Sequence, residues 1–362
     1  MSVAFAAGSA ASRLFVAERL VAADAATGSQ VYDYLPRTSA ELRALYPVDQ
    51  PYQTGYLPVG DGHSLYFERV GRPGGIPAVY LHGGPGGNIT PTNRGFFNPA
   101  QYDAVLYDQR GCGRSTFDAR GSLHANTTDD LVRDLEALRA YMGFERWAVF
   151  GGSWGATLAL KYAQEHPQAV SALMLRGIFL GTQQDLDWIY NRFGVARFYP
   201  EAWQHFVGHV SAADHFDLVH AYHELLNSRD PDVQRAAAIA WTQWEAHLAK
   251  LYVERGGITS VGDDTDIVRK AMIENHYMAN ALFMRDVRLI NGAAALSGIP
   301  TFIVNGRFDM LCPLANAWAL HAAITGSKLV IVPDSGHSFA EPGTLSALVD
   351  VTGYYAEMRS GG

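Results

Sequence analysis

Short apolar runs recur along the chain and alternate with longer amphipathic stretches. The runs at residues 78–81, 104–107 and 147–150 contain almost only apolar side chains, which is typical of parallel strands covered on both faces. Residues 129–143 instead place their leucines on one helical face and end at Gly143, so they predict an amphipathic helix. Further strands are predicted at residues 65–70, 172–175, 300–304 and 329–332. The alternation predicts an α/β fold with a mostly parallel central sheet flanked by helices.

The alternation disappears between residues 178 and 297, where the sequence is helical in character. An insertion at this point of a parallel sheet emerges at the carboxyl ends of the strands, so it predicts a helical cap that shapes a pocket. We therefore expect an N-terminal extension (residues 1–45), a core domain (46–180 and 296–362) and an inserted helical cap domain (181–295). The extension begins with residues rich in Ala and Ser, which predict an added helix or a loose segment. The cap holds four of the seven tryptophans: Trp188, Trp203, Trp241 and Trp244.

The segment Gly-Gly-Ser-Trp-Gly at residues 151–155 follows a predicted strand and precedes a predicted helix at 156–166. A strand, G-x-S-x-G and a helix form the nucleophile elbow, a tight turn that holds a serine hydroxyl clear of the sheet. The five-residue pattern also occurs in turns without chemistry, but its placement makes Ser153 the candidate nucleophile. Cys112 is an alternative nucleophile in a nearby loop, although no elbow surrounds it.

Two glycine-rich loops follow other predicted strands. Residues 82–87 read His-Gly-Gly-Pro-Gly-Gly, and in serine hydrolases of this layout such a loop supplies one backbone N–H of the oxyanion hole. The residue after the nucleophile supplies the second N–H, so the candidate donors are Gly84 and Trp154. The other loop, Asp-Gln-Arg-Gly-Cys-Gly-Arg-Ser at 108–115, carries charges that predict a structural brace for the active-site loops.

A serine nucleophile needs a histidine base, and the base needs an acid that fixes its tautomer. In this kind of fold the chain order is serine, acid, histidine. Asp309 lies just beyond the strand that follows the cap, and His337 lies in a glycine-containing loop after the next strand. Order and placement predict Asp309 and His337 as the partners of Ser153. Asp334 and Glu341 remain alternative acids.

Composition and charge exclude several classes of protein. The net charge of −8 without a Lys/Arg cluster argues against nucleic acid as a partner, and no apolar run approaches the ~20 residues of a membrane span. The two cysteines lack metal-ligand spacing to histidine, so we expect no metal and no cofactor. The first 30 residues match neither a secretory nor a transit signal, which favours a cytoplasmic protein.

Taken together, the motifs closely resemble those of the proline iminopeptidases (prolyl aminopeptidases), serine peptidases of the α/β-hydrolase fold. The resemblance runs from about Leu45 to Glu357. Its markers are HGGPGG at 82–87, DQRGCGRS at 108–115, GGSWG at 151–155, LRGIF at 175–179, WTQWE at 241–245, IENHY at 273–277, GRFDMLCP at 306–313 and DSGHSFAEPG at 334–343. The resemblance implies removal of N-terminal proline from small peptides, without a metal or cofactor.

The resemblance also implies that Glu245 and Glu274 bind the amino terminus of the substrate and that Arg176 organises them. Each glutamate shares a helical face with apolar residues, where a carboxylate is costly unless it is paired. A protonated N-terminal proline has two N–H donors, which two carboxylates can accept. The alternative is that both glutamates merely lie on solvated helices at the rim of the cap.

By the same resemblance, Phe179, Tyr190 and Met278 would wall the pocket for the proline ring. Family members often carry an aromatic residue where this chain has Met278, and methionine is more adaptable, so selectivity for proline is expected to be looser. These side chains could equally be ordinary cap core. The competing functions are a capped esterase or carbon–carbon bond hydrolase, a broader aminopeptidase, and a non-catalytic ligand-binding homologue.

Overall fold

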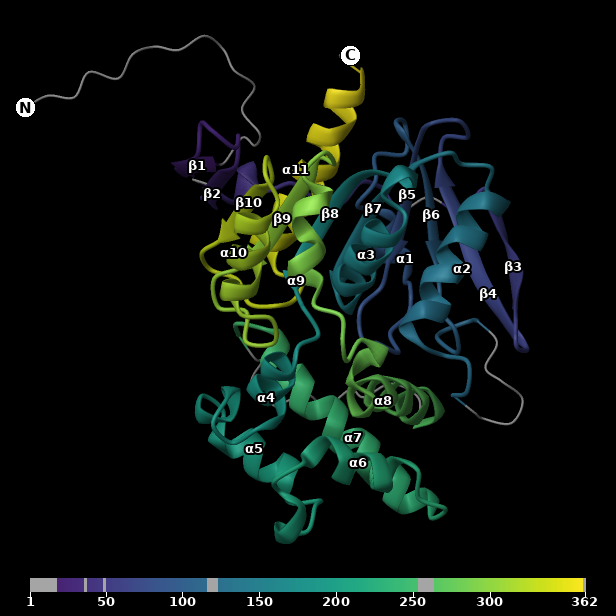
Figure 1. Ribbon diagram of the computed structural model, residues 1–362, viewed down its shortest axis with the longest axis vertical. Helices are drawn as coiled ribbons and strands as arrows, with labels where there is room; N and C mark the ends of the chain where they lie inside the picture. Colours follow the sequence, from purple (N-terminus) through teal and green to yellow (C-terminus); the bar gives the residue numbers. More distant parts are fainter. Residues whose placement is uncertain (1–17, 36–37, 48–49, 116–122, 253–263, 361–362) are drawn as a thin grey trace, which may run out of the picture.

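A ten-stranded, mostly parallel sheet runs through the centre of the protein (Figure 1). The computed structural model describes residues 18–35, 38–47, 50–115, 123–252 and 264–360. The strands lie in the order β1-β2-β10-β9-β8-β7-β5-β6-β4-β3. Along the chain they are β1 (Glu18–Ala23), β2 (Gln30–Tyr34), β3 (Gln53–Gly60), β4 (His63–Gly71), β5 (Ile76–Leu81), β6 (Tyr102–Tyr107), β7 (Trp147–Ser153), β8 (Val170–Ile178), β9 (Thr301–Gly306) and β10 (Lys328–Val332). Every apolar run predicted as a strand falls on one of them, and the α/β fold class is confirmed.

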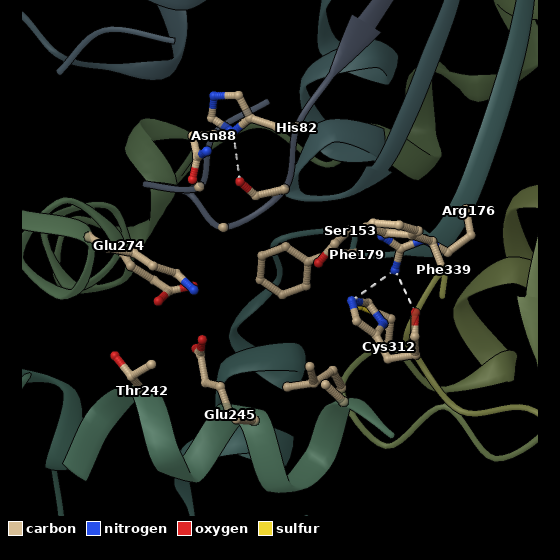
Figure 2. A pocket seen from close by; sticks show the side chains of 18 of the residues that line it. His82, Asn88, Ser153, Arg176, Phe179, Thr242, Glu245, Glu274, Cys312 and Phe339 are labelled. Carbon is tan, nitrogen blue, oxygen red and sulfur yellow. Dashed lines mark hydrogen bonds between the residues drawn. The ribbon is translucent and has the colours of Figure 1, made fainter. Parts of the chain in front are cut away.

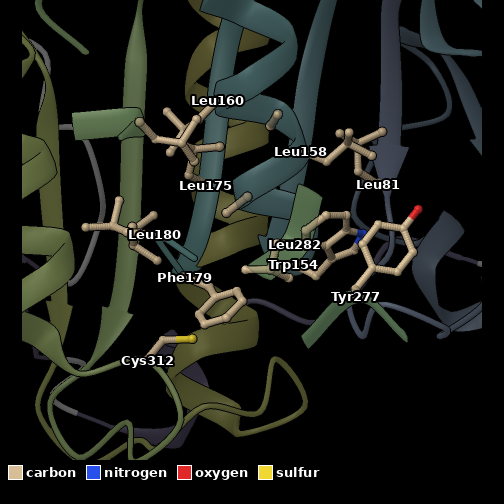
Figure 3. Close-up of a cluster of buried hydrophobic side chains, with 14 of the residues drawn as sticks. Leu81, Trp154, Leu158, Leu160, Leu175, Phe179, Leu180, Tyr277, Leu282 and Cys312 are labelled. Carbon is tan, nitrogen blue, oxygen red and sulfur yellow. The ribbon is translucent and has the colours of Figure 1, made fainter. Parts of the chain in front are cut away.

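Side chains of the central strands alternate between the two faces of the sheet and build a hydrophobic core on each face. Leu81 of β5 packs in one core with Leu158, and Tyr80 of the same strand packs in the other core with Phe150. Figure 3 shows the first core, in which leucines of the sheet meet leucines of the helix after the elbow. The first core contains residues of α2 (Thr128–Tyr141), α3 (Trp154–Glu165) and α10 (Leu314–Ala323), and the second contains residues of α11 (Pro342–Ser360). The amphipathic helix predicted at 129–143 is α2, and its last turn ends before Gly143.

Residues 18–34 form a β-hairpin, so the added helix or loose segment predicted for this part of the chain is wrong. Strand β2 pairs in parallel with β10, whose backbone groups on that side would otherwise be unpaired. The hairpin is fastened by Tyr34, which is fully buried and whose hydroxyl donates to Asp350 of α11 at 2.8 Å. Residues 1–17 of the expected extension lie outside the described residues.

Five helices form a separate layer at the carboxyl ends of the parallel strands (Figure 1). They are α4 (Gln183–Tyr190), α5 (Pro200–Val207), α6 (Leu218–Leu226), α7 (Pro231–Ala249) and α8 (Asp264–Ala279). Aromatic side chains hold this layer together. The ring of Phe206 stacks on that of Tyr222 with centroids 4.6 Å apart, and Trp241 and Trp244 are buried beside them. Two short helices, α1 (Pro91–Arg94) and α9 (Leu289–Gly292), lie in loops. Within the described part of the chain, no helix has both the length and the apolar character needed to cross a bilayer.

Candidate active site

Ser153 lies at a sharp turn between the end of β7 and the start of α3. Its backbone has a φ of 58°, a conformation that is strained for any residue with a side chain. Glycines are required around it: a Cβ on Gly151 would lie 2.2 Å from the carbonyl oxygen of Gly155, and a Cβ on Gly155 would lie 2.3 Å from that of Leu81. The turn therefore has the geometry expected of a nucleophile elbow, and Ser153 lines a cavity at its tip.

The candidate base and acid meet in the loops that follow β10 and β9. The Nδ1 atom of His337 lies 2.8 Å from Oδ2 of Asp309, and both residues are buried. The other carboxylate oxygen, Oδ1, accepts the backbone N–H groups of Leu311 and Cys312 at 3.0 and 2.7 Å. The alternative acid Glu341 accepts two backbone N–H groups and so shapes the histidine loop instead. Of the three candidate acids, Asp309 is the one that contacts the histidine among the described residues.

Arg176 differs from the prediction that it organises the two glutamates. Its Nη1 atom lies 3.0 Å from Nε2 of His337 and donates to the carbonyl oxygen of the same residue at 2.8 Å. Strand register explains this placement, because Arg176 of β8 lies opposite Gly152 of β7, where a Cβ would come within 2.5 Å of the guanidinium. Arginine can only donate, so Nε2 of His337 accepts and Nδ1 carries the proton toward Asp309. That is the tautomer a general base requires, and in this arrangement Nε2 accepts from Arg176.

The glycine-rich loop after β5 passes directly over the serine. A Cβ on Gly83 would lie 3.4 Å from Cβ of Ser153. Gly84 has a φ of 116°, and a Cβ there would lie 2.7 Å from two backbone nitrogens, so only glycine fits. Its backbone N–H belongs to the loop that passes Ser153, and that of Trp154 belongs to the first residue of α3, directly after the serine. The charged side chains of the loop at residues 108–115 form ion pairs, as expected of a structural brace. For example, Nε of Arg110 lies 2.7 Å from Oδ2 of Asp134.

A cavity of about 380 Å³ separates the serine from two glutamates of the cap. Figure 2 shows Glu245 and Glu274 on one side and Ser153 on the other. Glu245 of α7 accepts a hydrogen bond from the hydroxyl of Tyr190 at 2.6 Å, and Glu274 of α8 accepts one from the indole N–H of Trp241 at 3.2 Å. The two acidic side chains thus form one end of the cavity, and the serine forms the other.

Burial raises the pKa of Glu274 well above its usual range, and the neighbouring carboxylate of Glu245 raises it further. The side chain is only 3% exposed, so its charged form loses nearly all contact with water. Lys270, one helical turn earlier on α8, opposes this shift through its positive charge. Glu274 therefore holds a proton over a wider pH range than a free glutamate does.

The raised pKa of Glu274 predicts a loss of stability as pH rises. The folded state binds this proton more tightly than the unfolded state, so the contribution is complete below the unfolded pKa of about 4.5 and is lost as pH rises through the folded pKa. In that window the unfolding free energy of the protein, minus that of Glu274→Gln, should fall by up to about 1.4 kcal/mol per pH unit. Urea titrations between pH 4 and 9 measure this difference, and a flat difference would contradict the assignment.

The three residues predicted to wall the ring pocket do not play the same part. Phe179 and Met278 line the cavity, at the ends of β8 and α8. Tyr190 does not line it; instead its ring stacks on Trp241 at 4.7 Å and its hydroxyl holds Glu245. Tyr190 therefore lies behind Glu245 and not at the wall of this cavity, because its ring is stacked on Trp241 and its hydroxyl is turned to the carboxylate.

Sequence reasoning missed two polar residues that line the cavity, Lys270 and Thr242. Lys270 is a cation without an ion-pair partner among the described residues, and Thr242 has a hydroxyl oxygen without a hydrogen-bond partner there. Their spacing of three and four residues from the predicted glutamates is the signal that could have found them. Cys312, whose loop was expected near the catalytic face, also lines the cavity beside Ser153, and burial raises the pKa of its thiol. Burial likewise raises the pKa of Cys112, the alternative nucleophile, which does not line the cavity.

One cluster among the described residues has the ligand atoms for a metal ion, namely Asp309, Cys312 and His337. Its atoms lie within 4.8 Å of one another. The same carboxylate already accepts the histidine N–H and two backbone N–H groups, so hydrogen bonding explains the arrangement.

Comparison with known proteins supports the family that the sequence motifs indicate. Residues 77–344 match the model of a family described as the α/β hydrolase fold. A probable proline iminopeptidase of Leptolyngbya boryana is 43% identical over 89% of this chain and 99% of its own length. A proline iminopeptidase of Xanthomonas citri is 46% identical over 87% of this chain and all of its own length, and one of Arabidopsis thaliana is 46% identical over 86% and 82%.

Solved structures with similar architecture are much more distant in sequence. VinJ superposes with a TM-score of 0.57 at 19% identity, covering 85% of this chain and 99% of its own. An esterase of Exiguobacterium antarcticum superposes with a TM-score of 0.53 at 19% identity, covering 84% of this chain and all of its own. At such identities the likeness extends to the fold alone.

Proposed function

The chain belongs to the proline iminopeptidase family of α/β hydrolases, and from that premise we propose how it releases N-terminal proline from peptides. The observation that carries the proposal is the cavity with a serine at one end and two carboxylates at the other. An aminopeptidase must hold the free amino group of its substrate at a fixed distance from the nucleophile. The cavity has two acidic groups at the end opposite the serine, where they can hold this amino group. An esterase or carbon–carbon bond hydrolase does not need such groups.

The chemical step would start with attack by Ser153 Oγ on the carbonyl carbon of the substrate's proline. His337 Nε2 accepts the serine proton, and Asp309 stabilises the resulting imidazolium through Nδ1. The backbone N–H groups of Gly84 and Trp154 hold the tetrahedral oxyanion. His337 then protonates the leaving amine, the C–N bond breaks, and water hydrolyses the prolyl ester on Ser153 by the same steps.

The amine would bind between Glu245 and Glu274. A protonated pyrrolidine nitrogen has two N–H donors, one for each carboxylate, and its positive charge favours ionisation of Glu274. Binding is therefore expected to release the proton that burial holds on Glu274. Phe179 and Met278 would contact the ring carbons, and Arg176 would act on His337 rather than on the amine.

Glu245→Gln or Glu274→Gln is expected to lower kcat/KM for proline aminomethylcoumarin amide about 10- to 150-fold, because each removes a charge-assisted hydrogen bond worth about 1.5–3 kcal/mol. Glutamine still accepts the bonds from Tyr190 and Trp241, so the fold should be kept. Initial rates with the proline, alanine and leucine amides, N-blocked proline amide and a p-nitrophenyl ester measure the effect.

Glu224→Gln is the matched control, because it removes an exposed carboxylate of the cap from α6 outside the cavity. It should leave every rate unchanged. Full activity of both cavity variants on free proline amide would overturn the amine site. Turnover of the ester without turnover of any amide by the wild-type protein would overturn the peptidase function itself.

A further inference from the structure

The side chain of Gln109 connects the two segments that carry the oxyanion donors. Its Oε1 accepts the indole N–H of Trp154 at 2.9 Å, and its Nε2 donates to the carbonyl oxygen of His82 at 2.9 Å. In addition, its backbone N–H donates to Nε2 of His82 at 3.0 Å. All three residues are at least 98% buried, so water does not compete for these bonds.

On the loop side, the ring of His82 is held at both nitrogens. Nε2 faces the backbone N–H of Gln109, which can only donate, so Nε2 accepts and Nδ1 carries the proton. Nδ1 then donates to the carbonyl oxygen of Gly83 at 2.9 Å, the contact drawn in Figure 2. Burial lowers the pKa of His82, which keeps the ring neutral and preserves this arrangement. The backbone entering Gly84 is thereby fixed by His82 and its two partners.

On the elbow side, the indole of Trp154 is buried in the first core, beside Tyr277 and Leu282 (Figure 3). Its ring packs edge-on against Tyr277 with centroids 5.0 Å apart, and its N–H points to Gln109. Because Trp154 is the first residue of α3, holding its side chain also orients the start of that helix and its backbone N–H.

We propose that Gln109 is a positioning residue that sets the separation of the Gly84 and Trp154 N–H groups. The proposal rests on the proposed function, in which these two groups bind one oxyanion. Two donors stabilise one oxygen only when both lie about 2.7–3.1 Å from it, and they belong to segments about 70 residues apart in sequence. A primary amide is suited to the link, since it donates to one segment and accepts from the other with a single rigid group.

Gln109→Met tests this link, because methionine has a similar length but neither a strong donor nor a strong acceptor. The expected result is a 10- to 100-fold loss of kcat for proline aminomethylcoumarin amide with little change of KM, since a misplacement of about 1 Å costs up to about 100-fold. Pyrrolidine-2-boronic acid, which forms a tetrahedral adduct with a serine, should bind more weakly by a similar factor. Inhibition by free proline should be unchanged.

Gln109→Glu adds a signature that a purely structural role would not produce. Ionised, the new carboxylate still accepts from Trp154 but repels the carbonyl oxygen of His82; protonated, its O–H restores the donor. The kcat of this variant relative to wild type should therefore recover as pH falls. Nearby titratable groups include His82 and the two that act on it, Asp108 and Lys270; all three are present in both proteins, so a pH dependence found only in the variant reports the new carboxyl.

Thr352→Val is the matched control, since it removes buried hydrogen bonds of α11 at a residue that does not line the cavity. It should lower Tm without changing kcat. Unchanged kcat and boronate affinity in Gln109→Met, or an equal weakening of boronate and proline, would overturn the proposal while the wild-type activity stands. A wild-type protein inactive on every proline amide would instead refute the proposed function.

Discussion

Replacing Ser153 with alanine is expected to lower kcat for proline aminomethylcoumarin amide about a million-fold, the cost typical of removing a serine nucleophile. Ser153 is placed at the elbow with a φ of 58°, and its hydroxyl lies at the cavity where the oxyanion loop crosses. Alanine can keep the same backbone, so Tm should change little. Single-turnover kinetics and labelling by a fluorophosphonate probe measure the loss, and the variant should not be labelled.

Cys312 is the group that could act as a replacement nucleophile in Ser153→Ala, because it lies beside Ser153 and near the histidine. Burial raises the pKa of its thiol, which leaves it protonated and weakly nucleophilic at neutral pH. The double variant Ser153→Ala, Cys312→Ala should therefore match the single variant. Residual turnover that disappears only in the double variant would make Cys312 a second nucleophile. If Ser153→Ala turned over substrate as fast as the wild-type protein, Ser153 would be excluded as the nucleophile.

The parts of the fold that sequence analysis predicted are those determined by local patterns. Near-continuous apolar runs predicted six of the seven strands, because a strand buried on both faces has no polar side. The seventh, at residues 65–70, contains Glu68 and Arg69 and pairs antiparallel with both of its neighbours. The G-x-S-x-G segment was recognisable because its glycines are needed within five residues of chain: a Cβ on Gly151 would lie only 2.2 Å from the carbonyl oxygen of Gly155. The order of serine, acid and histidine then selected residues whose contact is seen at 2.8 Å between Asp309 and His337.

Other features depend on contacts that local patterns do not encode. The partner of Arg176 follows from the register that sets it opposite Gly152, and the role of Tyr190 follows from how α4 packs against α7. The N-terminal hairpin forms because β10 leaves an unpaired edge, a property of the assembled sheet. Gln109 looked like part of a charged brace, and only the fold brings its amide between His82 and Trp154.

Replacing Asp309 with asparagine is expected to lower kcat about 10,000-fold, as typically follows when the acid of such a triad becomes an amide. Oδ1 of Asp309 faces two backbone N–H groups, from Leu311 and Cys312, so the asparagine must keep its oxygen on that side. Its NH₂ group is then turned toward Nδ1 of His337. Nδ1 becomes the acceptor, the ring proton moves to Nε2, and Nε2 can no longer take the proton of Ser153. The pre-steady-state rate of acylation measures the loss.

Asp334→Asn provides the matched control, because it makes the same chemical change three residues before the histidine, where the alternative acid was placed. It is expected to leave kcat within about twofold, since Asp309 supplies the hydrogen bond to Nδ1. The KM of Asp309→Asn should stay near that of wild type, because the proposed amine site, Glu245 and Glu274, is at the opposite end of the cavity. A large loss in Asp334→Asn together with an active Asp309→Asn would reverse the assignment of the acid. A large rise in KM without a fall in kcat would mean that Asp309 acts on substrate binding instead of on the base.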